Sequence, residues 1–147
     1  MALPVGAPAH ERPAPAAGAA AGAEVAIGVV QELVFGPLIV FGLGGVAVSI
    51  PGGYAARLTP LSPSDADDMI RSLPGAPLLF GQGARPADSG ALADILVRVS
   101  RLADDLPEVA ELDLSPVITR SDGVCATGAR VRVTAAEHTD PFLRRLR

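Results

Sequence analysis

The sequence predicts an α+β fold in which a mixed or antiparallel sheet is accompanied by two main helices. Three observations support this fold class: short β-branched segments separated by glycine and proline in the first third of the chain, one long amphipathic helical pattern further on, and no repeated strand–helix–strand spacing. The length of 147 residues suits one domain. Although 49% of the residues are hydrophobic, only 3% are aromatic, so a domain of marginal stability is expected.

Both ends of the chain differ in composition from its middle. Residues 1–23 are dominated by alanine, proline and glycine, which bury too little apolar surface to offset the entropy of ordering, so a disordered arm is expected. Residues 24–134 hold the expected ordered domain, and residues 135–147 form a polar tail. The start has no basic segment followed by a compact apolar run, so no secretion signal is indicated and a cytoplasmic protein is expected.

Four short strands are expected in the first half of the domain. Residues 24–30 are rich in β-branched side chains, and residues 37–41 and 46–50 are apolar segments joined by a glycine turn at 42–45. A weaker strand at 54–58 follows a Pro-Gly-Gly turn.

An uncharged apolar run from Leu33 to Ile50 raises a second interpretation. Its eighteen residues are nominally long enough for a membrane-spanning helix, and a small membrane-associated protein is the corresponding alternative. Turn-forming residues at 35–37 and 42–45 interrupt the run, and neither a basic cluster nor an aromatic belt flanks it. These features favour two buried strands and no membrane partner.

Two helices are expected after these strands. Ser64 is a suitable N-cap for a helix whose first turn holds acidic residues that suit the helix dipole, and Pro74-Gly75 ends this helix. Residues 90–106 form the clearest helix because apolar side chains recur at intervals of three and four. These side chains are Leu92, Ile95, Leu96, Val99, Leu102, Ala103 and Leu106.

Two further strands are expected near the end of the domain. Residues 109–118 form one strand, in which one side carries mostly polar side chains and the other carries Ala110, Leu112, Leu114 and Pro116. Pro116 is expected to end the pairing of this strand. A turn follows at 121–123, and a last strand spans 129–134 with its two valines on one side.

One face of the 109–118 strand carries a row of oxygen-bearing side chains. Alternation places Glu111, Asp113 and Ser115 on this face, with Val109 at its start. Such a row can hold Mg²⁺, which prefers oxygen ligands and leaves room for phosphate groups. The alternative is a solvated strand face without a ligand, and the local residues favour it because serine is a weak ligand beside aspartate or glutamate.

The residue types exclude several classes of function. All 12 basic residues are arginines, so the chain has no lysine for a nucleophile, a Schiff base or a Walker-type phosphate contact. The net charge of −4 provides no overall basic field to hold nucleic acid, which is therefore not expected as a partner.

Several motifs, taken in their order along the chain, resemble a known family. They are Glu24-Val25-Ala26-Ile27-Gly28, Phe35-Gly36-Pro37-Leu38-Ile39-Val40-Phe41-Gly42-Leu43-Gly44-Gly45, Arg57-Leu58-Thr59-Pro60-Leu61 and Glu111-Leu112-Asp113-Leu114-Ser115-Pro116. Together they resemble the C-terminal half of the ATP-grasp domain of ADP-forming acyl-CoA (acetate–CoA) synthetases. The same domain is fused to acetyltransferase domains in some bacterial protein acetyltransferases. The resemblance covers residues 24–134 and implies a fold like the C-terminal ATP-grasp subdomain.

The resemblance implies ATP and Mg²⁺ as cofactors and a set of residues for them. Glu24 matches a ribose-binding carboxylate. Gly44 and Gly45 match a glycine turn near the floor of the nucleotide site. Asp113 matches a metal ligand, and Ser115 stands beside it where the family usually has asparagine. No residue is assigned a catalytic role.

The resemblance also implies an incomplete enzyme. The family usually has glutamate near the position of Ser49, so this residue and Ser115 both weaken the ligand set. On this resemblance, the segment before Glu24 is expected to be too short for the first ATP-grasp subdomain, and no CoA-binding or phosphohistidine region is expected within these residues. The implied activity is therefore acid–CoA ligation of the ADP-forming type, carried out only with a partner chain that supplies the rest. The alternative is a non-catalytic remnant, or an interaction or regulatory module of the same fold.

Overall fold

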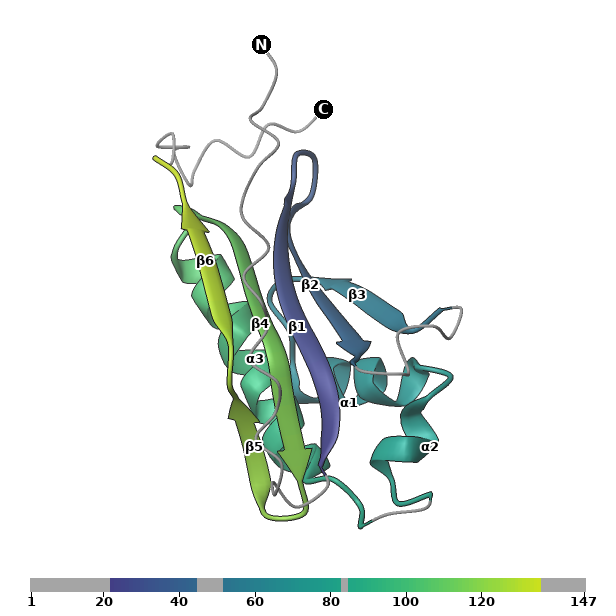
Figure 1. The fold of residues 1–147 in the computed structure, drawn as a ribbon. Helices are drawn as coiled ribbons and strands as arrows, with labels where there is room; N and C mark the ends of the chain where they lie inside the picture. Colours follow the sequence, from purple (N-terminus) through teal and green to yellow (C-terminus); the bar gives the residue numbers. More distant parts are fainter. Residues whose placement is uncertain (1–21, 45–51, 83–84, 136–147) are drawn as a thin grey trace.

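A six-stranded antiparallel sheet with helices against one face makes up the described part of the chain (Figure 1). The computed structural model describes residues 22–44, 52–82 and 85–135. Its elements in chain order are β1 (Ala23–Glu32), β2 (Gly36–Leu43), β3 (Tyr54–Leu58), α1 (Pro63–Ser72), α2 (Ala76–Leu79), α3 (Ser89–Asp105), β4 (Val109–Arg120), β5 (Gly123–Ala126) and β6 (Ala129–Val133). This architecture confirms the α+β class and the antiparallel sheet. Most of the expected arm at 1–23 and tail at 135–147 lies outside the described residues.

The strand order places β1 and β4 at the centre of the sheet. The order is β3-β2-β1-β4-β5, and β6 also pairs with β4. β4 pairs with β6 along its first half and with β5 along its second half. Two hydrogen bonds mark the change of partner, from the amide of Ser115 to the carbonyl of Gly128 at 3.1 Å and from the amide of Thr127 to the carbonyl of Pro116 at 2.9 Å.

The expectation that Pro116 ends the pairing of its strand is wrong. β4 continues through this residue to Arg120, and Val117 pairs with Val25 of β1 and with Ala126 of β5. The register between β1 and β4 shifts here, because Ile27 pairs with Leu114 and Val25 with Val117. One extra residue is therefore accommodated in β4 as a bulge, which lets the strand pass a proline without ending.

The two faces of the sheet have different surroundings. Alternate residues of β1, beginning with Val25, are buried against the helices, and the residues between them lie on the opposite, open face. In Figure 1, α1 and α3 lie behind the sheet; α3 packs against β1, β2 and β5, and α1 packs against α3 and β3. The largest fully buried apolar side chains of the core are Phe41, Ile27, Ile39, Met69, Ile70, Leu79, Leu92 and Leu96.

The helices agree with the sequence pattern, except that α1 begins at a different residue and that the one-turn helix α2 is additional. α3 matches the helix expected at 90–106, and the Asp88 carboxylate accepts a hydrogen bond from the amide of Ala91 at 2.9 Å. The expected N-cap Ser64 is wrong, because Ser62 caps α1. Ser62 exchanges hydrogen bonds with Asp65 in a capping box, and the proline that follows it takes the first helical position. The one-turn helix α2 was not expected.

The apolar run after Leu33 contributes a strand of the sheet. β2 continues to Leu43, so Gly42 belongs to the strand and not to a turn; it pairs with Ala26 on one side and with Tyr54 on the other. The strand expected at 46–50 lies outside the described residues. Within the ranges that the structure covers, no helix is long and apolar enough to cross a membrane.

Candidate functional site

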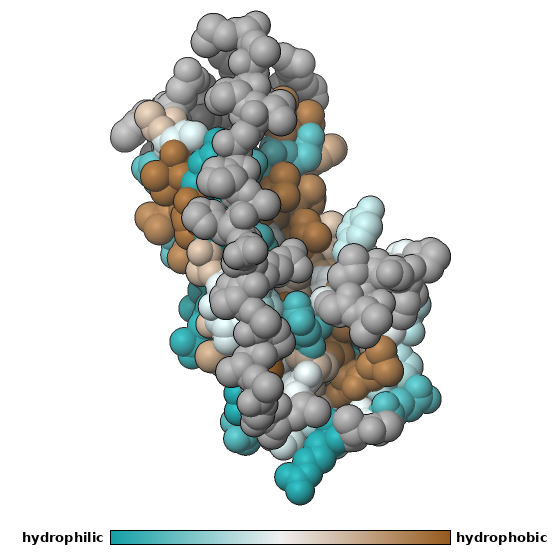
Figure 2. All heavy atoms as spheres, in the orientation of Figure 1, coloured by the Kyte–Doolittle hydropathy of each residue, from teal (hydrophilic) through white to brown (hydrophobic). Residues whose placement is uncertain are grey.

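A groove of about 690 Å³ lies on the open face of the sheet. Its apolar part is formed by β1 and β2, and its polar wall is formed by β4 and β6. Figure 2, which looks onto this face, shows hydrophobic residues over β6 and over the upper part of the β1–β2 hairpin. The charged side chains that line the groove are Glu111, Asp113, Arg130 and Arg132.

Strand alternation and register explain why these four charged side chains meet. Leu112 is buried on the helix side, so its neighbours Glu111 and Asp113 point to the open face, as the sequence predicted for them. Val109, expected on the same face, is instead buried. The register between β4 and β6 shifts between Val109 and Glu111, which breaks the alternation at that point.

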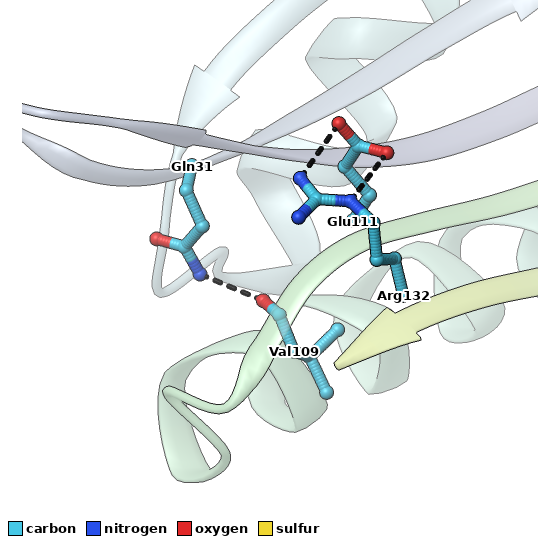
Figure 3. Close-up of polar contacts among 4 residues, drawn as sticks. All are labelled: Gln31, Val109, Glu111 and Arg132. Atoms are coloured by element: carbon cyan, nitrogen blue, oxygen red, sulfur yellow. Dashed lines mark hydrogen bonds and ion pairs between the residues drawn. The ribbon is translucent and has the colours of Figure 1, made fainter. Parts of the chain in front are cut away.

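Glu111 and Arg132 form a two-pronged ion pair across β4 and β6 (Figure 3). Nη2 of Arg132 lies 2.9 Å from Oε1 of Glu111, and Nε donates to Oε2 at 3.1 Å. The hydrogen bond and positive charge of Arg132 lower the pKa of Glu111, and the same contact raises the pKa of Arg132. Both side chains are more than half exposed, so the pair contributes little to the free energy of unfolding.

Asp113 and Arg130 face each other two residues further along the same two strands, and therefore on the same face. They are Cα partners across β4 and β6, and both side chains line the groove. On its other side Asp113 is paired with Gly28 of β1, which also lines the groove. Because glycine has no side chain, the groove stays open beside the Asp113 carboxylate.

Glu24 and Gly44 lie in contact at the start of β1 and the end of β2. The amide of Gly44 donates to the carbonyl oxygen of Glu24 at 2.7 Å. By alternation Glu24 is on the open face, four residues from Gly28, so about 13 Å of strand at ~3.3 Å per residue separates it from the position of Asp113. Neither Glu24 nor Gly44 lines the groove, and Gly45 and Ser49 lie outside the described residues.

Ser115 is half-buried at the bulge where β4 changes partner, and it does not line the groove. The structure thus does not bring its side chain into the groove beside that of Asp113. In the described part of the chain no three His, Cys, Asp or Glu side chains gather as a metal site. Mg²⁺ is often held by only one or two carboxylates together with phosphate and water. The exposed Asp113 carboxylate therefore fits as one ligand of such an ion.

Sequence reasoning missed Arg130 and Arg132 as groove residues, although a signal for them was present. The alternation at 129–134 put the two valines on one side, which leaves the two arginines together on the other. Only the pairing of β6 with β4 shows that this second side shares a face with Asp113.

The sequence of this chain matches a known family over most of its length. Residues 14–133 match the model of the ATP-grasp domain. The chain belongs to the ATP-grasp domain family. One relative, the beta subunit of the ADP-forming acetate–CoA ligase I of Pyrococcus furiosus, is 40% identical over 111 residues, which are 75% of this chain and 48% of the relative. The ADP-forming 4-hydroxybutyrate–CoA ligase of Nitrosopumilus maritimus is 38% identical over 103 residues, 69% of this chain and 15% of that ligase.

Solved structures show the same likeness. The dinucleotide-forming acetyl-coenzyme A synthetase 1 of Ca. Korarchaeum cryptofilum, in complex with coenzyme A and Mg-AMPPCP, superposes with a TM-score of 0.74 and 38% sequence identity. The match covers 79% of this chain and 55% of that one. This ATP-grasp chain therefore spans about half the length of the subunits that it matches, and much less of the longer ligases. The resemblance to ADP-forming acetate–CoA ligases noted in the sequence is confirmed.

Proposed function

We propose that the open face of this ATP-grasp sheet is one wall of a Mg·ATP site that serves ADP-forming acyl-CoA synthesis, completed by polypeptide outside this chain. Relatives named as ligases of two different acids, acetate and 4-hydroxybutyrate, share this segment and are both named as ADP-forming. They differ in the acid and share both CoA and the nucleotide, and this chain matches the ATP-grasp domain model over residues 14–133. The shared segment is therefore assigned to the nucleotide.

Three parts of the open face receive roles in this proposal. The Glu24 carboxylate binds the ribose at one end, and Gly44 lets the backbone come close to the nucleotide. Asp113 holds Mg²⁺ at the other end; Ser115, the neighbouring ligand that the resemblance implies, does not line the groove and receives no role. When bound, Mg²⁺ neutralises phosphate charge, which is the main requirement of phosphoryl transfer.

The observation that carries the proposal is the exposed Asp113 carboxylate inside a groove on the open face. Calorimetric titration of the chain with ATP, with and without Mg²⁺, tests it. We expect binding that requires Mg²⁺ and that is abolished by Asp113→Asn. Asp104→Asn is the matched control, because Asp104 is an equally exposed aspartate on α3.

The proposal assigns acid–CoA ligation to the complete assembly and not to this chain alone. Turnover is expected only after addition of the polypeptide that carries the remaining ATP-grasp and CoA-binding regions. On this proposal the protein works in the cytoplasm, where ATP and CoA are supplied.

A second candidate is a non-catalytic module of the same fold. Ser49 and Ser115, which stand where the resemblance implies glutamate and asparagine, favour it. Folded protein that shows no Mg·ATP binding at millimolar nucleotide would support this candidate and contradict the first.

A further inference from the structure

On the groove face, β4 and β6 carry two successive pairs of directly opposed residues, each pair made of one acidic side chain on β4 and one arginine on β6. We call each pair a rung. In the first rung Glu111 and Arg132 are Cα partners and are joined by contacts of 2.9 and 3.1 Å. In the second rung Asp113 and Arg130 are Cα partners, but among the ion pairs of the described residues none joins these two side chains. The first rung is thus closed by an ion pair, and the second rung, in which the two charged side chains are not joined, is called the open rung.

The difference between the rungs follows from side-chain length. Directly opposed residues have Cβ atoms about 5 Å apart. Glutamate reaches across to a guanidinium, whereas the carboxylate of aspartate is one methylene closer to its own strand. The second rung therefore presents an anionic and a cationic group side by side without neutralising either of them.

The position on β1 that lies beside Asp113 carries no side chain. Gly28, the partner of Asp113 on β1, lies on the open face and contributes only backbone to the groove. A ligand that carries a divalent cation and an oxyanion matches this arrangement, because a carboxylate coordinates Mg²⁺ and a guanidinium binds phosphate oxygens through its planar fork of donors.

We infer that Asp113 and Arg130 form a split metal–phosphate site, in which the Asp113 carboxylate holds Mg²⁺ and the Arg130 guanidinium binds phosphate oxygens of the same nucleoside triphosphate. This inference rests on the proposed function and adds Arg130 as the phosphate contact in a chain without lysine. Arg132 is tied to Glu111, so its guanidinium is less available to phosphate than that of Arg130.

The test compares Arg130→Ala, Arg130→Lys and Arg132→Ala in calorimetric titrations with Mg·ATP and with Mg·tripolyphosphate. Arg130→Ala is expected to weaken binding of both ligands at least about tenfold, because a charge-assisted hydrogen bond to phosphate is lost. Arg130→Lys recovers part of the affinity, since the charge remains but the planar fork is gone. Arg132→Ala removes the same charge from the same wall and is expected to cost less. Arg98→Ala on α3 is the control outside the groove, and thermal melts establish that every variant is folded.

The possible results separate this inference from the proposed function. The inference is overturned if Arg130→Ala binds both ligands as tightly as the wild-type chain does. It is also overturned if Arg130→Ala and Arg132→Ala lose the same affinity. Neither result contradicts Mg·ATP binding by the chain. Arg130-dependent binding of Mg·tripolyphosphate with no greater affinity for Mg·ATP supports the inference and contradicts the nucleotide function. Failure of the wild-type chain to bind either ligand at millimolar concentration overturns both.

Discussion

Gly44 packs so closely against Glu24 that a larger residue would have to displace the Glu24 side chain. The Gly44 amide donates to the Glu24 carbonyl oxygen at 2.7 Å, and a Cβ added at Gly44 would lie 2.7 Å from Cγ and 3.0 Å from Oε1 of Glu24. The absence of a side chain at Gly44 therefore decides where the Glu24 carboxylate lies.

Gly44→Ala is expected to weaken Mg·ATP binding as much as Glu24→Ala does, because it displaces the proposed ribose-binding carboxylate. The loss in the free energy of unfolding should stay below about 1 kcal/mol, since the obstructing atoms belong to a side chain that can rotate away. Calorimetry and urea denaturation measure the two quantities. If Gly44→Ala binds Mg·ATP as tightly as the wild-type chain while Glu24→Ala binds it clearly less tightly, the contact between Gly44 and Glu24 does not position the carboxylate.

Gly128→Ala should destabilise the fold by about 1–3 kcal/mol, because a Cβ at this position would overlap the backbone carbonyl oxygen of Ser115. The clash falls where β4 changes partner from β6 to β5, and backbone cannot rotate away as a side chain does. Gly90→Ala in the first turn of α3 is the control, since its Cβ would lie 3.5 Å from the Asp88 carboxylate and alanine favours a helix. Urea denaturation should show opposite signs for the two variants.

The capping box of α1 should make part of the stability depend on pH. Hydrogen bonds from the Ser62 hydroxyl and amide lower the pKa of Asp65 below its ordinary 3.8. The stabilisation is therefore fully present above pH 3.8 and is lost as the pH falls through the lowered pKa of the folded state.

Ser62→Ala tests this dependence. At neutral pH it is expected to lower the free energy of unfolding by about 1 kcal/mol, the usual cost of losing an N-cap. The difference from wild type should shrink in acid, below the lowered pKa of Asp65. Ser121→Ala, at an exposed serine in the turn between β4 and β5, is the control outside the cap, and urea titrations across the acid range give the comparison. A difference that is independent of pH would contradict the role of Asp65.

Glu111→Gln is expected to free the Arg132 guanidinium and to raise the affinity for Mg·tripolyphosphate, because one negative charge leaves the groove. Since the pKa of Glu111 is lowered, the wild-type pair should persist as the pH falls to its ordinary 4.5 and open only below it. The stability of the fold should change little, because the pair is exposed. Titration calorimetry at neutral pH is the measurement, and a lower affinity would contradict the assignment.

The tip of the β1–β2 hairpin should make the isolated chain self-associate. Leu33 is fully exposed, at 101%, and Phe35 is 71% exposed, although the Glu32 carboxylate holds the turn by accepting from the amides of Val34 and Phe35 at 2.7 Å. An ordered, exposed apolar tip of this kind favours association. The double substitution Leu33→Ser and Phe35→Ser should shift the protein towards monomer in light scattering without loss of stability. An unchanged mass distribution would rule out the tip as the contact.

Elements with a local sequence signal were predicted correctly without knowledge of the structure. The apolar stripe of α3 and the β-branched character of β1 depend on neighbouring residues and the period of one element, and both agree with the structure. The same is true of the alternation that turns Glu111 and Asp113 away from the core. The cap of α1 was misplaced by two residues because Ser62 and Ser64 are both good caps, and the proline between them decides the start.

Which of these elements come into contact could be learned only from the folded arrangement of the sheet. The contact of Glu24 with Gly44, the open rung of Asp113 and Arg130, and the continuation of β4 past Pro116 all depend on strand pairing between segments distant in the chain. Strand pairing depends on register, and a one-residue bulge changes the face to which a side chain points. The pattern of one strand carries no information about its neighbour's register, so the groove and its four charged side chains appear only when the sheet is assembled.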